Sequence, residues 1–220
     1  MRARVRVKIC GITGPESARV AADGGADAIG LVFAESPRRV TPDGAAQIVR
    51  ALPPWVTPVG VFVDAPADEV RELAEAVGFT AVQLHGDEPP EAVAELGRLK
   101  VIKAFRVGDD GDLEAACAWR EECERLGRLP DAYLLDARVP QGPKGGTGRP
   151  ADWDLAARMI NEKGFRPLVL AGGLGPDNVA EAIRRVRPWA VEGSSRLEAA
   201  PGRKDPARVR AFLEAVRCAG

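Results

Sequence analysis

Cys10 stands at the end of the first hydrophobic run of the chain, in the segment KICGIT, which covers Lys8–Thr13. A cysteine at the point where a strand passes into a loop holds its sulfur above a rigid backbone. Its thiolate could act as a base or as a nucleophile. A single cysteine in this position is more often a small buried hydrophobe, so the other residues must decide whether this thiol takes part in chemistry.

Further residues that could take part in chemistry or binding each follow a later hydrophobic run. Arginine suits a carboxylate, and histidine and aspartate can exchange protons. Taken singly, each also has a structural reading, because arginines are usually solvated, aspartate caps turns and histidine is often a satisfied core residue. The residues are Arg38 and Arg39, His85, Asp136, Gly172 and Gly173, Glu192, and Ser194 and Ser195.

Two of these segments suit an anion. Gly172-Gly173 would let the backbone approach a ligand closely with its N–H groups free, and a helix expected to begin at Pro176 would add its positive N-terminus. Ser194 and Ser195 offer hydroxyl donors after the last hydrophobic run. Glycine-rich turns are common, but two adjacent ones predict a phosphate site.

The elements that must position these residues alternate along the chain. Short β-branched runs are separated by alanine-rich amphipathic stretches, which indicates parallel strands joined by helices. Eight such units in 220 residues predict a single-domain α/β fold over residues 1–220, a (β/α)8 barrel of parallel strands with outer helices, with a doubly wound sheet as the alternative. The expected strands are Val5–Ile9, Ala28–Phe33, Pro58–Val63, Ala81–Leu84, Val101–Phe105, Ala132–Leu135, Leu168–Leu170 and Trp189–Val191. The expected helices are Pro15–Ala22, Pro42–Leu52, Ala67–Val77, Glu88–Leu99, Leu113–Leu126, Trp153–Glu162, Pro176–Val186 and Asp205–Cys218.

In such a barrel the site lies at the C-terminal ends of the strands, where the chemical side chains gather, and the loops after the last two strands usually bind phosphate. Strand alternation puts Lys8 on the same face as Cys10. An inward lysine needs an acidic partner, and we expect Glu192 on the neighbouring last strand to supply it. The Gly- and Pro-rich segment Ala137–Ala151 is expected to be a mobile cover over the site.

Composition narrows the range of partners. The chain has 31 basic and 32 acidic residues, which gives no reason to expect nucleic acid or an anionic membrane, and this balance fits a monomer or a homodimer. No apolar segment is long enough for a membrane span, and no signal core follows the basic N-terminus, so we expect a cytoplasmic protein. Four cysteines without CxxC spacing and one histidine make a metal site improbable.

The motifs together resemble the phosphoribosylanthranilate isomerase family. The resemblance runs in order over nearly the whole chain, and its pieces include Lys8–Thr13 (KICGIT), Gly25–Phe33 (GADAIGLVF), Val82–Glu88 (VQLHGDE), Gly145–Gly148 (GGTG) and Leu170–Leu174 (LAGGL). The specific combination is KICGIT with VQLHG and the downstream GGTG. It implies a (β/α)8 barrel that performs an Amadori rearrangement of a phosphosugar in tryptophan biosynthesis. Such a reaction needs an acid and a base but no metal or redox cofactor.

The resemblance also implies a role for each residue. Cys10 would be the general base and Asp136 the general acid; a thiol base is helped by a lowered pKa and a carboxyl acid by a raised one. Arg38 would hold the anthranilate carboxylate, with Arg39 as its immediate neighbour. His85 would position the substrate. The phosphate would lie against Gly172, Gly173, Ser194 and Ser195.

The chain departs from the family pattern after the last strand. The family usually reads Asp-Val-Ser-Ser-Gly-Val-Glu, whereas this chain has Glu192-Gly193-Ser194-Ser195-Arg196-Leu197-Glu198. If the position of Arg196 required a positive φ, an arginine would be strained there; alternatively it would add a charge near the phosphate. Two other functions therefore stay open: a different phosphosugar enzyme, such as a ribulose-phosphate epimerase or an indoleglycerol-phosphate synthase, and a non-catalytic phosphosugar-binding barrel.

Overall fold

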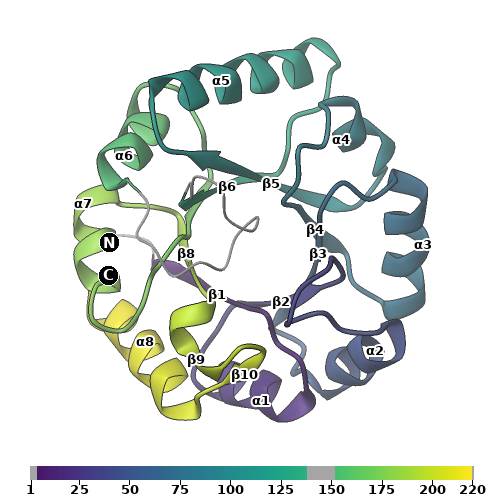
Figure 1. Cartoon of the computed structure of the whole chain (residues 1–220), viewed down its shortest axis with the longest axis vertical. Helices are drawn as coiled ribbons and strands as arrows, with labels where there is room; N and C mark the ends of the chain where they lie inside the picture. The colour runs from purple at the N-terminus through teal and green to yellow at the C-terminus, as the bar shows by residue number, and fades with distance from the viewer. Residues whose placement is uncertain (1–3, 138–151, 220) are drawn as a thin grey trace.

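The strands form one closed barrel. The computed structural model describes residues 4–137 and 152–219. Within them, eight parallel strands pair in chain order, and β8 closes the barrel by pairing with β1 (Figure 1). The predicted (β/α)8 barrel is confirmed, and the doubly wound sheet is excluded. The strands are β1 Arg6–Cys10, β2 Ala28–Val32, β3 Thr57–Phe62, β4 Ala81–Leu84, β5 Lys100–Val107, β6 Ala132–Ala137, β7 Leu168–Leu170 and β8 Ala190–Gly193.

The helices surround the barrel as an outer ring (Figure 1). Several begin at a side-chain cap: Thr41 accepts a hydrogen bond from the Gly44 N–H, and Asp109 accepts one from the Asp112 N–H. The helices are α1 Pro15–Asp23, α2 Pro42–Ala51, α3 Ala67–Val77, α4 Glu91–Glu95, α5 Asp110–Arg125, α6 Trp153–Asn161, α7 Val179–Val186 and α8 Pro206–Ala219.

Three helices differ from their predicted bounds by three residues or more, each for a local reason. Helix α5 begins at Asp110 and not at Leu113, because Asp109 caps it. The predicted helix Glu88–Leu99 is reduced to α4, because two prolines follow Glu88 and that glutamate is turned inward. Helix α7 begins at Val179 and not at Pro176, because the Gly175 N–H donates to Asn178 Oδ1 and closes a turn there. The short elements between β8 and α8 were not predicted: a 3-10 turn η1, Ser195–Leu197, and a hairpin of β9, Glu198–Ala200, and β10, Arg203–Lys204.

The barrel interior changes character along its axis. The main apolar core contains residues of both the strands and the helices, whereas a small second cluster contains Ala104, Leu134, Val169, Ala171 and Ala190 from β5 to β8 and the start of the loop after β7. Two residues further along their strands, on the same face as Leu134 and Ala190, stand the buried carboxylates Asp136 and Glu192. The C-terminal half of the interior is therefore polar, and that is where a site can form.

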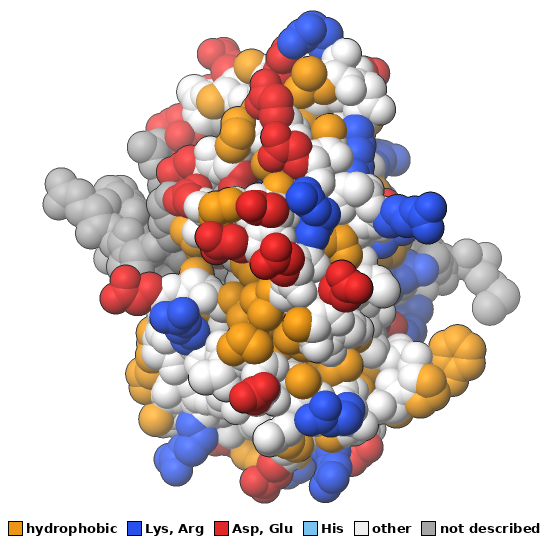
Figure 2. Space-filling model, turned by 90° about the vertical axis from the view of Figure 1, so that its right-hand side faces the viewer, with side chains coloured by type: hydrophobic (Ala, Val, Ile, Leu, Met, Phe, Trp, Pro, Cys, Tyr) orange, Lys and Arg blue, Asp and Glu red, His pale blue; other side chains and the backbone are white. Residues whose placement is uncertain are grey.

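The outer surface carries charges of both signs. Figure 2 shows the flank on which α3 lies, where acidic and basic side chains are interspersed with apolar ones. None of the helices in the described residues combines the length and hydrophobicity needed to cross a membrane.

Candidate active site

The structure brings the predicted acid and base to one end of the barrel. Cys10 is the last residue of β1, His85 directly follows β4, and Asp136 lies at the end of β6. All three are buried, with exposed fractions of 7 to 8%. The closed barrel thus brings residues that are far apart in the sequence together at its C-terminal end.

Lys8 is a buried lysine that joins several polar groups at this end of the barrel. Its Nζ donates to Glu192 Oε2 at 2.5 Å and to Gln83 Oε1 at 2.7 Å, and Cys10 is a further hydrogen-bonding partner. Lys8 is paired with Glu192 in the register of β1 against β8, so the two side chains leave adjacent strands on the same face. The expected ion pair between these residues is confirmed.

Two opposing effects act on the charge of Lys8. Burial lowers its pKa, but the charge of Glu192 and the charge that Cys10 carries once it is ionised outweigh burial, so the pKa ends above its usual value. Lys8 is therefore an ammonium group within the barrel. Its hydrogen bonds to partners on three strands provide the acceptors that a buried ammonium requires.

The pKa of the Cys10 thiol is shifted upward, whereas a lowered pKa was expected for a thiol that acts as a base. Burial raises its pKa, and the negative charge of Glu192 raises it further, while Lys8 and Lys204 oppose both. The net shift is upward, so the protein without substrate holds a neutral thiol at neutral pH.

Gly30 makes the room for this thiol. It is paired with Cys10 in the register of β2 against β1. A Cβ atom at Gly30 would lie 2.7 Å from Cys10 Sγ and 3.0 Å from Lys8 Nζ, and contacts this short require one of the groups to move. The glycine therefore allows the sulfur and the ammonium to lie against the backbone of the neighbouring strand.

The imidazole of His85 connects Gln83 to Asp136. Its Nδ1 lies 2.7 Å from Gln83 Nε2, and its Nε2 lies 3.2 Å from Asp136 Oδ2. Because Gln83 also accepts from Lys8, hydrogen bonds run without a break from the surroundings of Cys10 to Asp136. The predicted acid and the predicted base are thus joined through Gln83, which the sequence analysis did not select.

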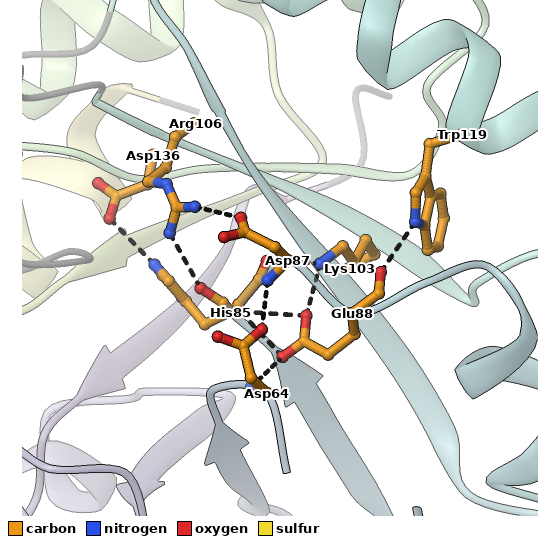
Figure 3. A network of polar contacts seen from close by, with 9 residues as sticks. Asp64, His85, Asp87, Glu88, Lys103, Arg106, Trp119 and Asp136 are labelled. Carbon is orange, nitrogen blue, oxygen red and sulfur yellow. Dashed lines mark hydrogen bonds and ion pairs between the residues drawn. The ribbon is translucent and has the colours of Figure 1, made fainter. Parts of the chain in front are cut away.

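A second buried ion pair holds the loop that carries His85 (Figure 3). Glu88 accepts from Lys103 Nζ at 2.6 Å and from the backbone N–H groups of Gly86 and Asp64. Arg106 donates to the carbonyl of His85 at 3.3 Å. Burial lowers the pKa of Lys103 against the opposing charge of Glu88. The loop after β4 is therefore fixed by charges on β5 and not by its own sequence alone.

Arg38 and not Arg39 points into the structure. Arg39 is exposed, whereas the Arg38 guanidinium donates through Nε and Nη2 to both carboxylate oxygens of Glu198, each at 2.8 Å. Lys204 Nζ shares the same carboxylate at 2.8 Å. One edge of the Arg38 guanidinium is thus held by Glu198, which orients the side chain.

The turns after β7 and β8 contain the residues that are predicted to bind phosphate. Gly172 and Gly173 have φ of 79° and 62°, a conformation that favours glycine, and among the described residues no hydrogen bond uses their N–H groups. The Ser194 hydroxyl donates to the Cys10 carbonyl at 3.3 Å. This bond ties the turn after β8 to the end of β1.

Arg196 is not strained. It lies in η1 and is absent from the non-glycine residues with positive φ in the described part of the chain. Its guanidinium contacts both oxygens of Asp177, at 2.9 and 2.8 Å, and the Gly173 carbonyl at 3.2 Å. The arginine therefore bridges the two turns, an arrangement that a glycine could not provide.

Several residues of the site were missed by sequence reasoning. Gln83 and Gly30 lie inside motifs that matched the family, and a polar amide within a hydrophobic strand was a usable signal for Gln83. Glu198 and Lys204 belong to the unpredicted segment after β8, so nothing in the sequence pattern placed them beside Arg38. The predicted cover, including Gly145–Gly148, lies outside the described residues. Among those described, no three His, Cys, Asp or Glu side chains are grouped to hold a metal ion.

Polar side chains at the C-terminal end of a closed eight-stranded barrel define a (β/α)8-barrel enzyme. Residues 7–215 match the family model described as N-(5′-phosphoribosyl)anthranilate (PRA) isomerase. The isomerase of Geobacter sulfurreducens is 51% identical over 210 residues, which are 95% of this chain and 97% of that protein. The chain belongs to the N-(5′-phosphoribosyl)anthranilate isomerase family, and it is an isomerase of tryptophan biosynthesis.

Solved structures agree with this assignment. The phosphoribosyl anthranilate isomerase of Thermotoga maritima superposes with a TM-score of 0.85 at 41% identity, covering 97% of this chain and 99% of that one. A phosphoribosyl anthranilate isomerase in complex with reduced 1-(o-carboxyphenylamino)-1-deoxyribulose 5-phosphate has a TM-score of 0.82 at 40% identity, with the same coverage.

The raised pKa of Cys10 predicts the pH range in which its thiolate forms. A raised pKa means that the neutral thiol persists to higher pH, so in the absence of substrate the thiolate forms only above the ordinary value of about 8.5. The ultraviolet thiolate absorbance of wild type minus that of Cys10→Ser measures this directly, because the other cysteines cancel. A thiolate already formed at neutral pH would contradict the account.

Glu88→Met tests how much the ion pair between Lys103 and Glu88 contributes to the free energy of unfolding. The change leaves Lys103 buried without its counter-charge and removes the acceptor of two backbone N–H groups. Breaking a buried pair in this way costs roughly 3–5 kcal/mol of the free energy of unfolding. Urea denaturation measures the loss, with the exposed Glu95→Met on α4 as the matched control, expected to change stability by less than about 0.5 kcal/mol. Equal stability of the two variants would refute the role given to Glu88.

Proposed function

We propose that this isomerase, as one catalytic domain, uses Asp136 as general acid and Cys10 as general base. It would convert N-(5′-phosphoribosyl)anthranilate to 1-(2-carboxyphenylamino)-1-deoxyribulose 5-phosphate. The observation that carries the proposal is the unbroken chain of buried hydrogen bonds that links the two residues at the C-terminal end of the barrel. An acid and a base on opposite sides of a small substrate are what an Amadori rearrangement needs.

Asp136 begins the reaction in this proposal. Its carboxyl proton passes to the ring oxygen of the ribose while the bond between that oxygen and C1′ breaks. The lone pair of the anthranilate nitrogen forms the new C1′=N bond, so the open-chain product is an iminium cation. Asp136 is left as a carboxylate, which His85 stabilises through the contact at 3.2 Å.

Cys10 then removes the proton on C2′. The electrons of that C–H bond form a C1′=C2′ double bond, and the nitrogen regains its lone pair. The resulting enolamine becomes the ketone when its hydroxyl proton is lost and C1′ is protonated. The raised pKa of the thiol fits this order, because the iminium cation adds its positive charge to those of Lys8 and Lys204, which already oppose burial.

The two ends of the substrate have matching groups. Arg38 is held rigidly by Glu198 and offers a guanidinium for the anthranilate carboxylate. The N–H groups of Gly172 and Gly173, with Ser194 and Ser195 on the facing turn, suit the phosphate. His85 would contribute by orientation and not by proton transfer. The proposed ligand is thus the phosphosugar alone, with no cofactor, for a cytoplasmic monomer or homodimer.

A non-catalytic or differently specific phosphosugar-binding barrel is not favoured. Its main support was the altered turn after β8, and that turn is unstrained and linked to the turn after β7.

Cys10→Ala and Asp136→Asn test the proposed chemistry. Loss of either proton-transfer group should lower kcat by about 10²–10⁴-fold or more, while substrate still binds through its carboxylate and phosphate. The decrease in the fluorescence of the anthranilate derivative measures turnover. Wild-type rates in both variants would sink the mechanism.

Arg196→Gly distinguishes a bridge between turns from a phosphate ligand. If Arg196 only bridges the turns, loss of its exposed pair with Asp177 is worth up to about 1 kcal/mol, so KM should rise by no more than roughly fivefold with kcat unchanged. Asp177→Asn should then have the same effect. A much larger rise in KM for Arg196→Gly, with none for Asp177→Asn, would instead make Arg196 a direct ligand.

A further inference from the structure

A chain of hydrogen bonds leads from Lys8 through Gln83 and His85 to Asp136. Only one assignment of donors and acceptors fits this chain. A protonated lysine has three N–H donors and no acceptor. The Gln83 atom that lies 2.7 Å from Lys8 Nζ must therefore be its amide oxygen. The opposite orientation would place the amide N–H₂ against the ammonium with both groups buried, and two buried donors without an acceptor between them are strongly unfavourable.

This orientation determines the other end of the amide. With its oxygen directed to Lys8, Gln83 presents its Nε2 group to His85 Nδ1 at 2.7 Å. An amide N–H₂ can only donate, so Nδ1 must be the unprotonated ring nitrogen. The imidazole is then neutral, and its single N–H is on Nε2, directed at Asp136 Oδ2.

We propose that Gln83 is a positioning residue, which transmits the charge of Lys8 to His85 and holds the imidazole in the Nε2–H tautomer. The hydrogen bonds of the Gln83 side chain go to Lys8 and to His85, so it acts through these neighbours. The consequence concerns the acid. The imidazole N–H engages Oδ2 of the acid at 3.2 Å and so orients the Asp136 carboxyl group. This last step rests on the proposed role of Asp136 as the acid.

The other charged groups near His85 are compatible with this direction. They lie on four strands: Asp136 on β6, Arg106 on β5 at its carbonyl, and Lys8 on β1 and Glu192 on β8, which reach it through Gln83. The positive charge of Lys8 disfavours a second positive charge on the imidazole, while Asp136 favours a ring N–H directed toward itself. The first effect supports a neutral ring, and the second supports the proton on Nε2.

The chain has one histidine, so the tautomer can be read directly. Tag-free protein labelled with ¹⁵N-histidine gives one pair of imidazole nitrogens in a long-range ¹H–¹⁵N correlation spectrum, which separates the two tautomers and the imidazolium. At neutral pH without substrate we expect the Nε2–H tautomer alone. A spectrum of the Nδ1–H tautomer or of the imidazolium would overturn the proposal.

Gln83→Glu reverses the hydrogen bond to His85 Nδ1, from donated to accepted, while nearly preserving the shape of the side chain. A carboxylate accepts from both Lys8 and His85, so the Nδ1 nitrogen must now carry a proton, and the spectrum should change to the Nδ1–H tautomer or the imidazolium. We expect kcat to fall by about 10²-fold with a smaller change in KM, because a proton-transfer group and not a binding group is disturbed. Gln47→Glu, the same change at an exposed position on α2, should leave the spectrum and kcat unchanged.

A Gln83→Glu protein with the wild-type tautomer and wild-type kcat would overturn the proposal. If this variant fails to fold, the wild-type spectrum still decides. The role of Asp136 as the acid and the tautomer of His85 can be refuted independently. Turnover by Asp136→Asn would refute the acid but leave the tautomer standing, whereas the wrong wild-type tautomer would refute the positioning role while the acid stands.

Discussion

The ammonium group of Lys8 is the constraint on which the site depends. A positive charge inside a barrel requires an acceptor for each of its donors, and here these come from β8, from β4 and from β1 itself. Only a closed barrel brings these strands together, because β8 must lie beside β1 for Glu192 to reach Lys8. The fold thus allows the charge to be buried, and the charge in turn orients Gln83 and acts on the thiol of Cys10.

Burial and charge oppose one another throughout this end of the barrel, and their balance differs from residue to residue. Charges prevail over burial at Lys8, which stays an ammonium, whereas burial prevails at Cys10 and at Lys103. Buried ion pairs are weak contributors to stability, and apolar replacements of similar volume are often neutral or stabilising. The pairs of Lys8 with Glu192 and of Lys103 with Glu88 are therefore better explained by what they position, a thiol in one case and the loop of His85 in the other.

The fold could be predicted from the sequence because the apolar pattern and the connecting helices are local features. The ends of the strands then placed Cys10, His85 and Asp136 correctly, and strand alternation with barrel closure was enough to pair Lys8 with Glu192. What could not be predicted depends on contacts across the barrel. The link through Gln83, the space provided by Gly30, and the meeting of Arg38 with Glu198 and Lys204 each join segments whose distance is set only by the closed structure. The start of α7 was misplaced because a side-chain turn at Asn178 replaced the expected proline start.

The most direct test of this account is to replace the central ion pair with apolar residues of similar size, as Lys8→Met with Glu192→Leu, and to measure stability and catalysis on the same protein. If the pair serves function, the free energy of unfolding should be unchanged or higher by roughly 1–4 kcal/mol, while kcat/KM falls by at least about 10²-fold. A double variant that keeps the wild-type kcat/KM would contradict the account, because Cys10, Gln83 and His85 would then be organised without the buried charge.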